Sequence, residues 1–292
     1  MSGGGHVVIV GPGRAGLSLG YALVRAGAVD SLTVSGRRVE PPAHPLFTEG
    51  LAEYAFGLIR PGPHTVAMFL AVPDGVVPEL AHALAVLGPA PEGCAAFHMS
   101  GALSTDVLAP LHASGYEVGS FHPLQALAHP VTGAARLPGS WVAVTGGPGA
   151  VSVARRLAAA LGSPILAVPE ARRPLYHAAA VMASNFLPPL MDNACRLLER
   201  AGIPYEQALS ALLPLVRGTL ENIAERGVEG SVAGPIPRGD VETVELHLRA
   251  LDPEGRRLYA TLGLELLRLA APSMPEDTRR SLVERLNAEI RG

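Results

Sequence analysis

The sequence predicts an α/β protein with a doubly wound parallel sheet over residues 1–168 and an all-helical domain over residues 169–292. Two observations predict this division. Up to about Val168, apolar β-branched runs alternate with helical patterns, which is typical of parallel strands joined by crossover helices. From Ala171 onward helical periodicity dominates, and no strand pattern interrupts it. A chain of 292 residues is long enough to give each domain its own core.

The first element is a strand that ends in a glycine-rich turn. An apolar run over residues 6–10 leads into Gly-x-Gly-x-x-Gly, and a helical pattern and a second strand over residues 31–34 follow. A strand, this turn and a helix together form the dinucleotide-binding fingerprint of a Rossmann domain. The first glycine allows the tight turn, the second allows the pyrophosphate to approach, and the third allows close helix packing. The expected cofactor contacts are Gly11, Pro12, Gly13, Arg14, Ala15 and Gly16.

The end of the second strand indicates which cofactor is bound. NAD enzymes usually place an acidic residue there to hold the ribose hydroxyls, but this chain has Ser35, Gly36, Arg37 and Arg38. Two arginines and a serine suit a 2′-phosphate through charge-assisted hydrogen bonds. The sequence therefore favours NADP over NAD. The alternative, two solvated arginines that bind no ligand, stays open at this point.

Further strands are predicted over residues 65–72, 95–98, 118–121 and 141–145. The first is almost wholly apolar, as expected for a central strand that is buried on both faces, and it is broken by Pro73, Asp74 and Gly75. Ligands of such sheets lie beside the carboxyl ends of the strands. Ala71, Val72 and Pro73 are thus expected to pack against the nicotinamide, although simple strand termination explains them equally well.

Two histidines follow predicted strands. His98 ends one strand and is followed closely by Ser100, and His122 ends the next strand. Histidine titrates near neutral pH and can exchange the proton that accompanies a hydride. Because both histidines fall at carboxyl ends of strands, they are candidate catalytic residues, together with Ser100. The alternative is that each is a structural histidine.

The helical half contributes two further polar clusters. His177 and Ser184 share a face of a long helix and Asn185 follows directly, where Pro188 and Pro189 free backbone carbonyls and predict a polar kink. This face is expected to form the substrate wall, with a water-satisfied bend as the alternative. Arg238, in a Gly/Pro-rich loop before Asp240, is a candidate for binding a substrate carboxylate, with a surface arginine as the alternative.

Composition excludes several classes of function. The chain has no lysine, which rules out Schiff bases and amine acid–base catalysis, because arginine stays protonated. The net charge of −3, without a basic cluster, gives no reason to expect nucleic acid or a membrane surface. Cys94 and Cys195 are far apart and are expected to be buried thiols, and no metal motif is present. Without a signal-peptide pattern or a long apolar run, we expect a cytoplasmic protein.

Six motifs together resemble Rossmann-like proteins that carry a C-terminal DUF2520 domain. In chain order they are GPGRAG, LAVPD, HMSG, FHPLQ, YHAAAVMASNF and GPIPRGD. The resemblance implies an NADP-type Rossmann domain, a helical domain similar to those of pyrroline-5-carboxylate reductases and 6-phosphogluconate-dehydrogenase-like enzymes, and a homodimer built through the helices. It assigns no substrate.

The missing lysine separates this chain from some related enzymes. Ketopantoate reductases, 6-phosphogluconate dehydrogenases and β-hydroxyacid dehydrogenases depend on a catalytic lysine, which this chain cannot supply. Prephenate dehydrogenases use a histidine instead, and their His-Pro segment is similar to His122 and Pro123. By this analogy, His122 is the expected proton donor or acceptor.

The leading hypothesis is an NADP-dependent oxidoreductase that acts on a small carbonyl, imine or alcohol substrate, with a carboxylated substrate as one option. His122 would handle the proton, His98 and Ser100 would orient the substrate, and His177 and Asn185 would complete the pocket with Ser184. Two alternatives stay open. One is a non-catalytic NADP-binding sensor or scaffold, and the other is a deazaflavin (F420)-dependent NADP reductase.

Overall fold

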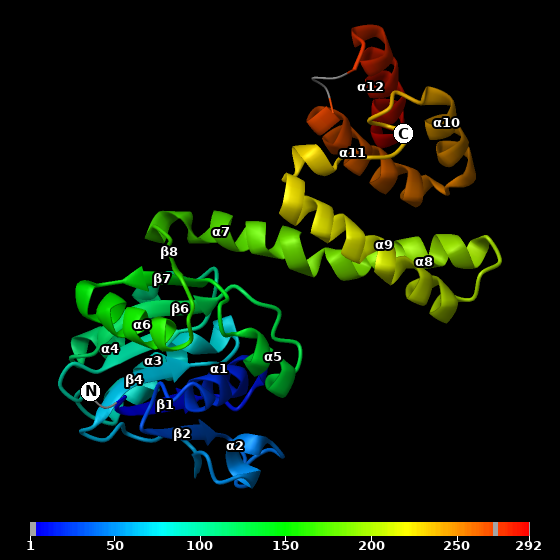
Figure 1. Cartoon of the computed structure of the whole chain (residues 1–292). Helices are drawn as coiled ribbons and strands as arrows, with labels where there is room; N and C mark the ends of the chain where they lie inside the picture. The colour runs from blue at the N-terminus through cyan, green and yellow to red at the C-terminus, as the bar shows by residue number, and fades with distance from the viewer. Residues whose placement is uncertain (1–3, 271–273, 292) are drawn as a thin grey trace. The chain divides into compact units, whose positions relative to one another are not determined.

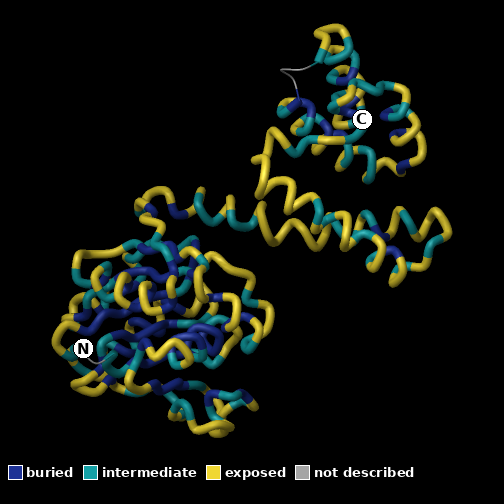
Figure 2. Tube along the Cα trace, in the orientation of Figure 1, coloured by how far each residue is buried: buried dark blue, intermediate teal, exposed yellow. Residues whose placement is uncertain are grey.

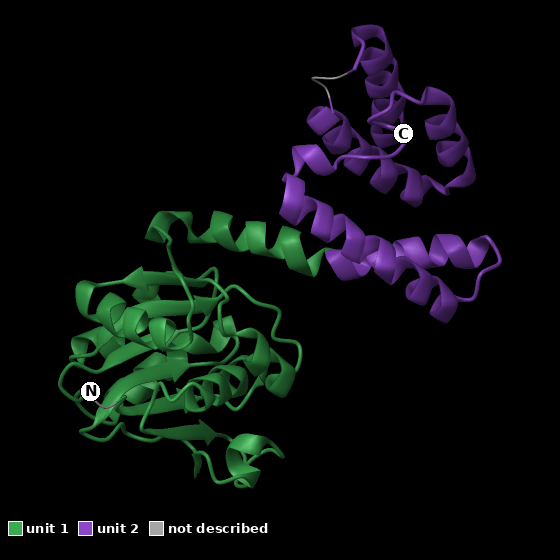
Figure 3. Cartoon of the chain, in the orientation of Figure 1, with its two compact units in different colours: residues 1–186 green, residues 187–292 purple. Residues whose placement is uncertain are grey.

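The computed structural model describes residues 4–270 and 274–291. The chain forms two compact units, residues 1–186 and 187–292 (Figure 3). The sheet ends before the predicted division at 168/169, whereas the compact units divide after Phe186. The division of the chain into two functional domains stays a prediction.

The first unit is built on an eight-stranded sheet in the order β3-β2-β1-β4-β5-β6-β7-β8 (Figure 1). The strands are β1 (His6–Val10), β2 (Ser31–Gly36), β3 (Glu53–Phe56), β4 (Thr65–Leu70), β5 (Ala95–His98), β6 (Glu117–Pro123), β7 (Val142–Gly146) and β8 (Ile165–Ala167). The strands from β1 to β6 pair in parallel, and the strand order reverses at β1. Ligands bind doubly wound sheets at this reversal. The predicted fold class is confirmed.

Two strands were not predicted, and one predicted strand runs in an unexpected direction. β3 and β8 are short edge strands that sequence periodicity does not predict. β7 runs antiparallel to β6. The amide of Leu124, just after β6, donates to the carbonyl of Trp141, just before β7, at 2.8 Å. The end of β6 and the start of β7 therefore lie at the same edge of the sheet. Because the chain does not cross back to the other edge, β7 must run in the opposite direction.

Helices cover both faces of the sheet because residues alternate along the strands. In β1, Val7 and Ile9 belong to one buried cluster and Val8 and Val10 to the other. On the first face lie α1 (Arg14–Arg25), α5 (Pro130–Arg136) and α6 (Pro148–Ala160), and on the second α3 (Val77–Val86) and α4 (Ala109–Ala113). Shorter elements are α2 (Pro45–Thr48), η1 (Asp74–Val76), η2 (Thr105–Leu108) and η3 (Glu170–Arg172). The unit ends with α7 (Arg173–Ala180) and the π-helical turn η4 (Val181–Asn185).

The second unit contains a helical hairpin and a helical bundle. The hairpin is α8 (Leu187–Arg200) and α9 (Tyr205–Arg226), and the bundle follows the short η5 (Glu229–Ser231) and contains α10 (Val241–Ala250), α11 (Pro253–Ala270) and α12 (Glu276–Arg291). The bundle buries an apolar core. The hairpin buries only Cys195 and Ala208 among its described residues, and most of its length is exposed (Figure 2).

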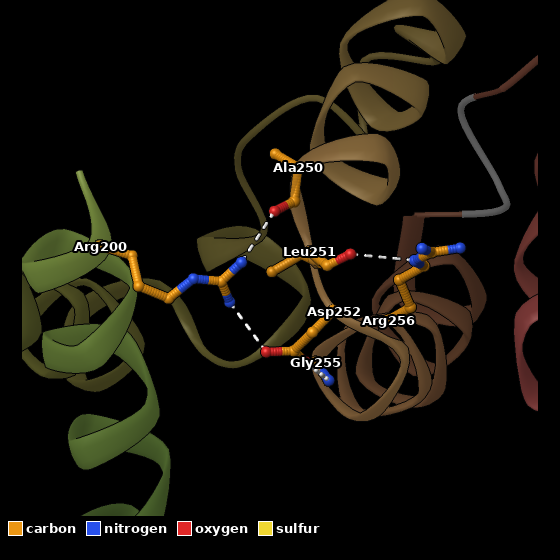
Figure 4. A network of polar contacts seen from close by, with 6 residues as sticks. All are labelled: Arg200, Ala250, Leu251, Asp252, Gly255 and Arg256. Atoms are coloured by element: carbon orange, nitrogen blue, oxygen red, sulfur yellow. Dashed lines mark hydrogen bonds and ion pairs between the residues drawn. The ribbon is translucent and has the colours of Figure 1, made fainter.

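A polar network joins the end of α8 to the corner between α10 and α11 (Figure 4). Arg200 donates to the Asp252 carboxylate at 2.8 Å and to the carbonyl of Ala250 at 3.4 Å. The other Asp252 oxygen accepts the amide of Gly255 at the start of α11. Because the Arg200–Asp252 pair is about half exposed, it contributes at most about 1 kcal/mol to stability.

The described helices include none that is both long and apolar enough to cross a membrane. Cys94 and Cys195 are buried free thiols, as predicted. Burial raises the pKa of the Cys94 thiol to about 12, so that side chain is inert at neutral pH.

Candidate functional site

The glycine turn between β1 and α1 is closely packed at its first and last glycines. Gly11 has a φ of +114°, and a Cβ there would lie 2.4 Å from the carbonyl oxygen of Ala71. A Cβ on Gly16 would lie 2.3 Å from the Gly11 oxygen. Only glycine fits at these two positions, because side chains would enter space that backbone already fills. The turn therefore packs directly against the carboxyl end of β4.

Gly13, the middle glycine, is open. No atom lies within 4 Å of the position that its Cβ would occupy. Gly13 is the N-cap of α1, and the helix has neither a side-chain cap nor an acidic residue in its first turn. Its free N–H groups and positive dipole end are thus available to an anion. This geometry fits the pyrophosphate of a dinucleotide.

A cavity of about 330 Å³ lies beside this end of α1. It brings together the glycine turn and the segments that follow β4 and β5. Its lining residues are Gly13, Arg14, Ala15, Ala71, Val72, Pro73, Asp74, Met99, Ser100 and Leu127. The cavity therefore gathers three of the six residues predicted to contact the pyrophosphate, all three predicted nicotinamide contacts and the candidate catalytic Ser100.

A second cavity of about 400 Å³ lies at the opposite edge of the sheet. It is formed around the amino ends of β1, β2 and β4 and includes His6, Asp30 and His64. None of the predicted site residues lines it. Since ligands of parallel sheets bind at the carboxyl ends of the strands, the cavity beside the glycine turn is the candidate cofactor site.

The carboxyl end of β2 has the features expected for the adenosine end of a cofactor. Ser35 is fully buried, and its hydroxyl has no hydrogen-bond partner among the described residues. A Cβ on Gly36 would lie 2.6 Å from the Tyr54 hydroxyl, which itself donates to the carbonyl of Arg38 at 2.8 Å. Arg37 and Arg38 are exposed and form no ion pair among the described residues. Both guanidinium groups are therefore available to an anionic ligand.

Ser100 holds together the turns that follow β4 and β5. Its hydroxyl donates to the Asp74 carboxylate at 2.7 Å and accepts the amides of Ala102 and Leu103, each at 3.1 Å. Asp74 opens the 3₁₀ turn that leads into α3. The Ser100 hydroxyl is thus fully engaged within the protein, and it orders one wall of the cavity.

His122 lies beside this wall, against two residues of α7. Its Nδ1 lies 2.7 Å from the Tyr176 hydroxyl, and its ring meets the His177 ring edge to face, with 6.0 Å between the ring centres. Gly101 lies against both imidazoles, because a Cβ there would lie 2.5 Å from His177 Cδ2 and 3.1 Å from His122 Nε2. Burial, with smaller effects from His177 and Arg173, lowers the pKa of His122 to about 4. His122 is therefore a neutral imidazole at pH 7.

The start of α7 carries a residue that the sequence motifs did not indicate. Arg173 is completely buried beneath the site. Its guanidinium donates to the carbonyls of Ser100 and Leu103 at 2.5 and 2.6 Å, and to the hydroxyls of Ser120 and Thr145 at 2.5 and 3.0 Å. It forms no ion pair with a carboxylate among the described residues. The sequence shows only two adjacent arginines, and nothing in the pattern distinguishes buried Arg173 from exposed Arg172.

His98 lies at the end of β5 and is 0% exposed. Neither ring nitrogen has a hydrogen-bond partner among the described residues. Burial, and next the charge of Arg173, lowers its pKa to about 3. Contact between His98 and a substrate would require the surrounding segments to move, so its catalytic role stays a prediction.

The remaining predicted residues lie farther along the chain. Ser184 and Asn185 are exposed in the π-helical turn η4, where the amide of Phe186 donates to the carbonyl of Val181. π-helical turns are frequent at functional sites, and the two prolines that follow explain this one. Arg238 belongs to the second unit and is exposed. The substrate-binding roles of these three residues stay predictions.

No group of three or more His, Cys, Asp or Glu side chains in the described part of the chain could hold a metal ion. The polar groups that the structure gathers are instead imidazoles, a phenol, a hydroxyl and one buried guanidinium. This set can bind, orient and exchange protons with an organic substrate.

Two family models match the chain. Residues 4–123 match a Rossmann-like domain, and residues 140–266 match the domain of unknown function DUF2520. This chain carries a Rossmann-like domain and a C-terminal DUF2520 domain. The resemblance found in the sequence motifs is therefore confirmed. No curated protein matches the sequence.

Solved structures share the fold of this Rossmann-DUF2520 chain. A provisionally named NADP oxidoreductase from Bacteroides fragilis is 23% identical, with a TM-score of 0.69 over 90% of this chain and 98% of the other. A protein from Thermotoga maritima is 21% identical, with a TM-score of 0.66 over 96% and 99% of the chains. A Plasmodium falciparum pyrroline carboxylate reductase with NADP bound is 11% identical, with a TM-score of 0.61 over 98% of each chain. At these identities the likeness shows the fold.

Proposed function

We propose that this protein is an NADP-dependent oxidoreductase that reduces or oxidises a small organic substrate, with His122 exchanging the proton. The observation that carries the proposal is the cavity beside the glycine turn. Ser100 lines this cavity, and the adjacent Gly101 lies against His122 and His177. When bound, the cofactor supplies or accepts a hydride at its nicotinamide ring. The fold shared with NADP-binding reductases supports the same conclusion.

The chain's own residues have separate tasks in this proposal. The turn around Gly13 binds the pyrophosphate, and Ala71, Val72 and Pro73 border the nicotinamide. Asp74 and Ser100 hold the cavity wall in place. His122 exchanges a proton with the substrate oxygen or nitrogen, and its Nε2 has no protein partner among the described residues.

NADPH consumption with a panel of small carbonyl and imine compounds tests this proposal. We expect turnover with at least one class and a loss of about 100-fold or more in kcat on His122→Ala, since general acid–base catalysis contributes roughly 10²–10⁴-fold. His82→Ala is the matched control, because His82 is an exposed histidine of α3. Full turnover by the His122 variant would remove that residue from the mechanism.

The two alternative functions give different results in the same assay. A sensor or scaffold binds NADPH but does not consume it, whichever substrate is added. A deazaflavin-dependent enzyme reduces NADP only when a reduced deazaflavin is supplied. The lowered pKa of His122, next to the Ser100–Gly101 wall of the cavity, favours proton exchange over a purely structural role, because perturbed pKa values cluster at functional sites.

The preference for NADP is tested at the end of β2. Replacing Arg37 and Arg38 together by glutamine should weaken NADPH binding about tenfold or more, because each hydrogen bond from a charged group contributes about 1.5–3 kcal/mol. NADH binding should change little. Arg155→Gln, which alters an exposed arginine of α6, is the control for lost surface charge. Equal weakening of NADPH and NADH would contradict the assignment of these arginines to a 2′-phosphate.

The α8–α9 hairpin supports the proposal that the partner of this chain is a second copy of itself. Soluble monomers rarely expose many large apolar side chains on one pair of helices. The exposed residues of this hairpin include Leu190, Leu197, Leu213, Leu215, Leu220 and Ile223. Covering these side chains requires an equally apolar surface, and another hairpin provides one.

Analytical ultracentrifugation tests this assembly. The wild type should sediment as a dimer, and the double variant Leu215→Arg/Leu220→Arg should sediment as a monomer, because both leucines are more than half exposed in the single chain. Leu246→Arg is the control, since Leu246 is equally exposed but lies on α10. A monomeric wild type would contradict the proposal.

A further inference from the structure

The hydrogen bond between Tyr176 and His122 determines which imidazole nitrogen carries the proton. The Tyr176 hydroxyl lies 2.7 Å from His122 Nδ1, and neither side chain has another hydrogen-bond partner among the described residues. If Nδ1 carried the proton and donated it, the phenol proton would have no protein acceptor. The satisfied arrangement has the phenol donating to Nδ1, which places the imidazole proton on Nε2.

The surroundings keep this imidazole uncharged. Arg173 carries a buried positive charge whose four hydrogen-bond acceptors are all neutral oxygens. His177 lies on another side of the ring, and the Asp74 carboxylate is the one acidic group that favours protonation. Burial and the nearby cation outweigh that carboxylate, so the imidazole stays neutral.

A neutral Nε2–H beside a buried guanidinium discriminates between carbonyl substrates and protonated imines. It can donate a hydrogen bond to a carbonyl or carboxylate oxygen, but a protonated imine offers it no lone pair. The positive charge of Arg173 also disfavours a cationic substrate close by. We propose that Tyr176 is a positioning residue that fixes His122 as an Nε2–H donor, so that the site takes a carbonyl substrate in preference to an iminium ion.

This inference rests on the proposed oxidoreductase function, and its proton transfers balance. As the carbonyl carbon receives a hydride from NADPH, the carbonyl oxygen takes the Nε2 proton of His122. Nε2 would then regain a proton from water, which leaves hydroxide, while Tyr176 keeps its hydrogen bond to Nδ1, so that His122 returns to the Nε2–H form. The carbonyl is reduced to an alcohol and NADPH is oxidised to NADP⁺.

Nitrogen NMR of protein labelled with ¹⁵N-histidine tests the tautomer without any turnover. The His122 signals are assigned by their absence from a His122→Gln variant. At pH 7.5 we expect one protonated nitrogen, Nε2, and an unprotonated Nδ1 far downfield. Tyr176→Phe should shift His122 to a mixture of both tautomers. An Nδ1–H tautomer or an imidazolium in the wild type would overturn the inference.

The chain offers a matched control for this experiment. In the second unit, the Tyr259 hydroxyl lies 2.9 Å from His247 Nδ1, with the two rings edge to face as in the Tyr176–His122 pair. Tyr259→Phe should alter only the His247 signals and leave both the His122 signals and NADPH consumption unchanged. A change in the His122 signals of this variant would mean that they respond to any disturbance of the protein. It would overturn the conclusion that Tyr176 fixes the His122 tautomer.

Substrate preference gives a second test of the inference. NADPH consumption is compared between 2-oxo acids or aldehydes and 1-pyrroline or its carboxylates. We expect kcat/KM to be at least about tenfold higher for the carbonyl compounds, which corresponds to about 1.4 kcal/mol, and to fall in Tyr176→Phe mainly through kcat. Preference for the cyclic imines would overturn the inference while leaving the oxidoreductase function intact. Consumption with neither class would contradict both the function and the substrate class, while the spectrum would still decide the tautomer.

Discussion

Replacing Arg173 by leucine should lower the free energy of unfolding by about 2–4 kcal/mol, because a buried acceptor that loses its donor costs about 1–3 kcal/mol. The guanidinium satisfies two carbonyls and two hydroxyls that come from three separate segments: the turn after β5, β6 and β7. Leucine fills part of the volume but leaves these buried acceptors without donors. Urea-induced unfolding, followed by circular dichroism, measures the change.

Arg172, the residue before Arg173, provides the control for this loss of stability. Arg172 is exposed, so Arg172→Leu should change stability by no more than about 0.5 kcal/mol. Arg173→Lys keeps a positive charge but lacks the planar fork of donors, and should fall between the wild type and the leucine variant. Equal stability of the two leucine variants would show that the Arg173 network contributes nothing.

Replacing Gly13 by aspartate should abolish most NADPH binding while leaving the protein at least as stable as the wild type. The position of its Cβ is free of neighbours, and aspartate is a better N-cap than glycine by a few tenths of a kcal/mol. The new carboxylate would occupy the helix end that the pyrophosphate needs and repel its charge. We expect an affinity loss of about 100-fold or more, equivalent to about 2.7 kcal/mol.

Isothermal titration with NADPH and thermal unfolding of the same samples separate the two effects. Gly13→Asn caps the helix without the charge, so it should bind NADPH more tightly than Gly13→Asp. Gly147→Asn, at the uncapped start of α6, is the control for a new cap elsewhere and should bind normally. Unchanged NADPH affinity in Gly13→Asp would place the phosphates somewhere else.

The fold class could be predicted because the patterns that indicate it lie within short stretches of the sequence. The β1–turn–α1 unit needs glycine at positions 11 and 16, and the apolar runs of the central strands identify a sheet that is buried on both faces. The helices of the second half follow their apolar periodicity. β3 and β8 escaped prediction because strands of four and three residues at a sheet edge leave too short a pattern.

The candidate site was predicted in part. The glycine turn, the segment after β4 and Ser100 meet around one cavity, as expected for residues that follow neighbouring strands. His98 and His122 occupy equivalent places in the sequence, yet the structure buries both nitrogens of His98 without a hydrogen-bond partner and pairs Nδ1 of His122 with the Tyr176 hydroxyl. Periodicity does not separate them, because the burial of each imidazole depends on the segments that pack over it.

The sequence by itself determined that this protein has a Rossmann-type glycine turn, arginines in place of an acid after the second strand, no lysine chemistry and a helical second half. Each of these is a property of residue type or short-range spacing. Only the tertiary structure decided that Arg173 lies beneath the site, that Tyr176 contacts His122 and that Gly101 lies against both imidazoles. These contacts join residues about 20 to 75 positions apart, and their energies depend on burial, which a sequence pattern does not encode.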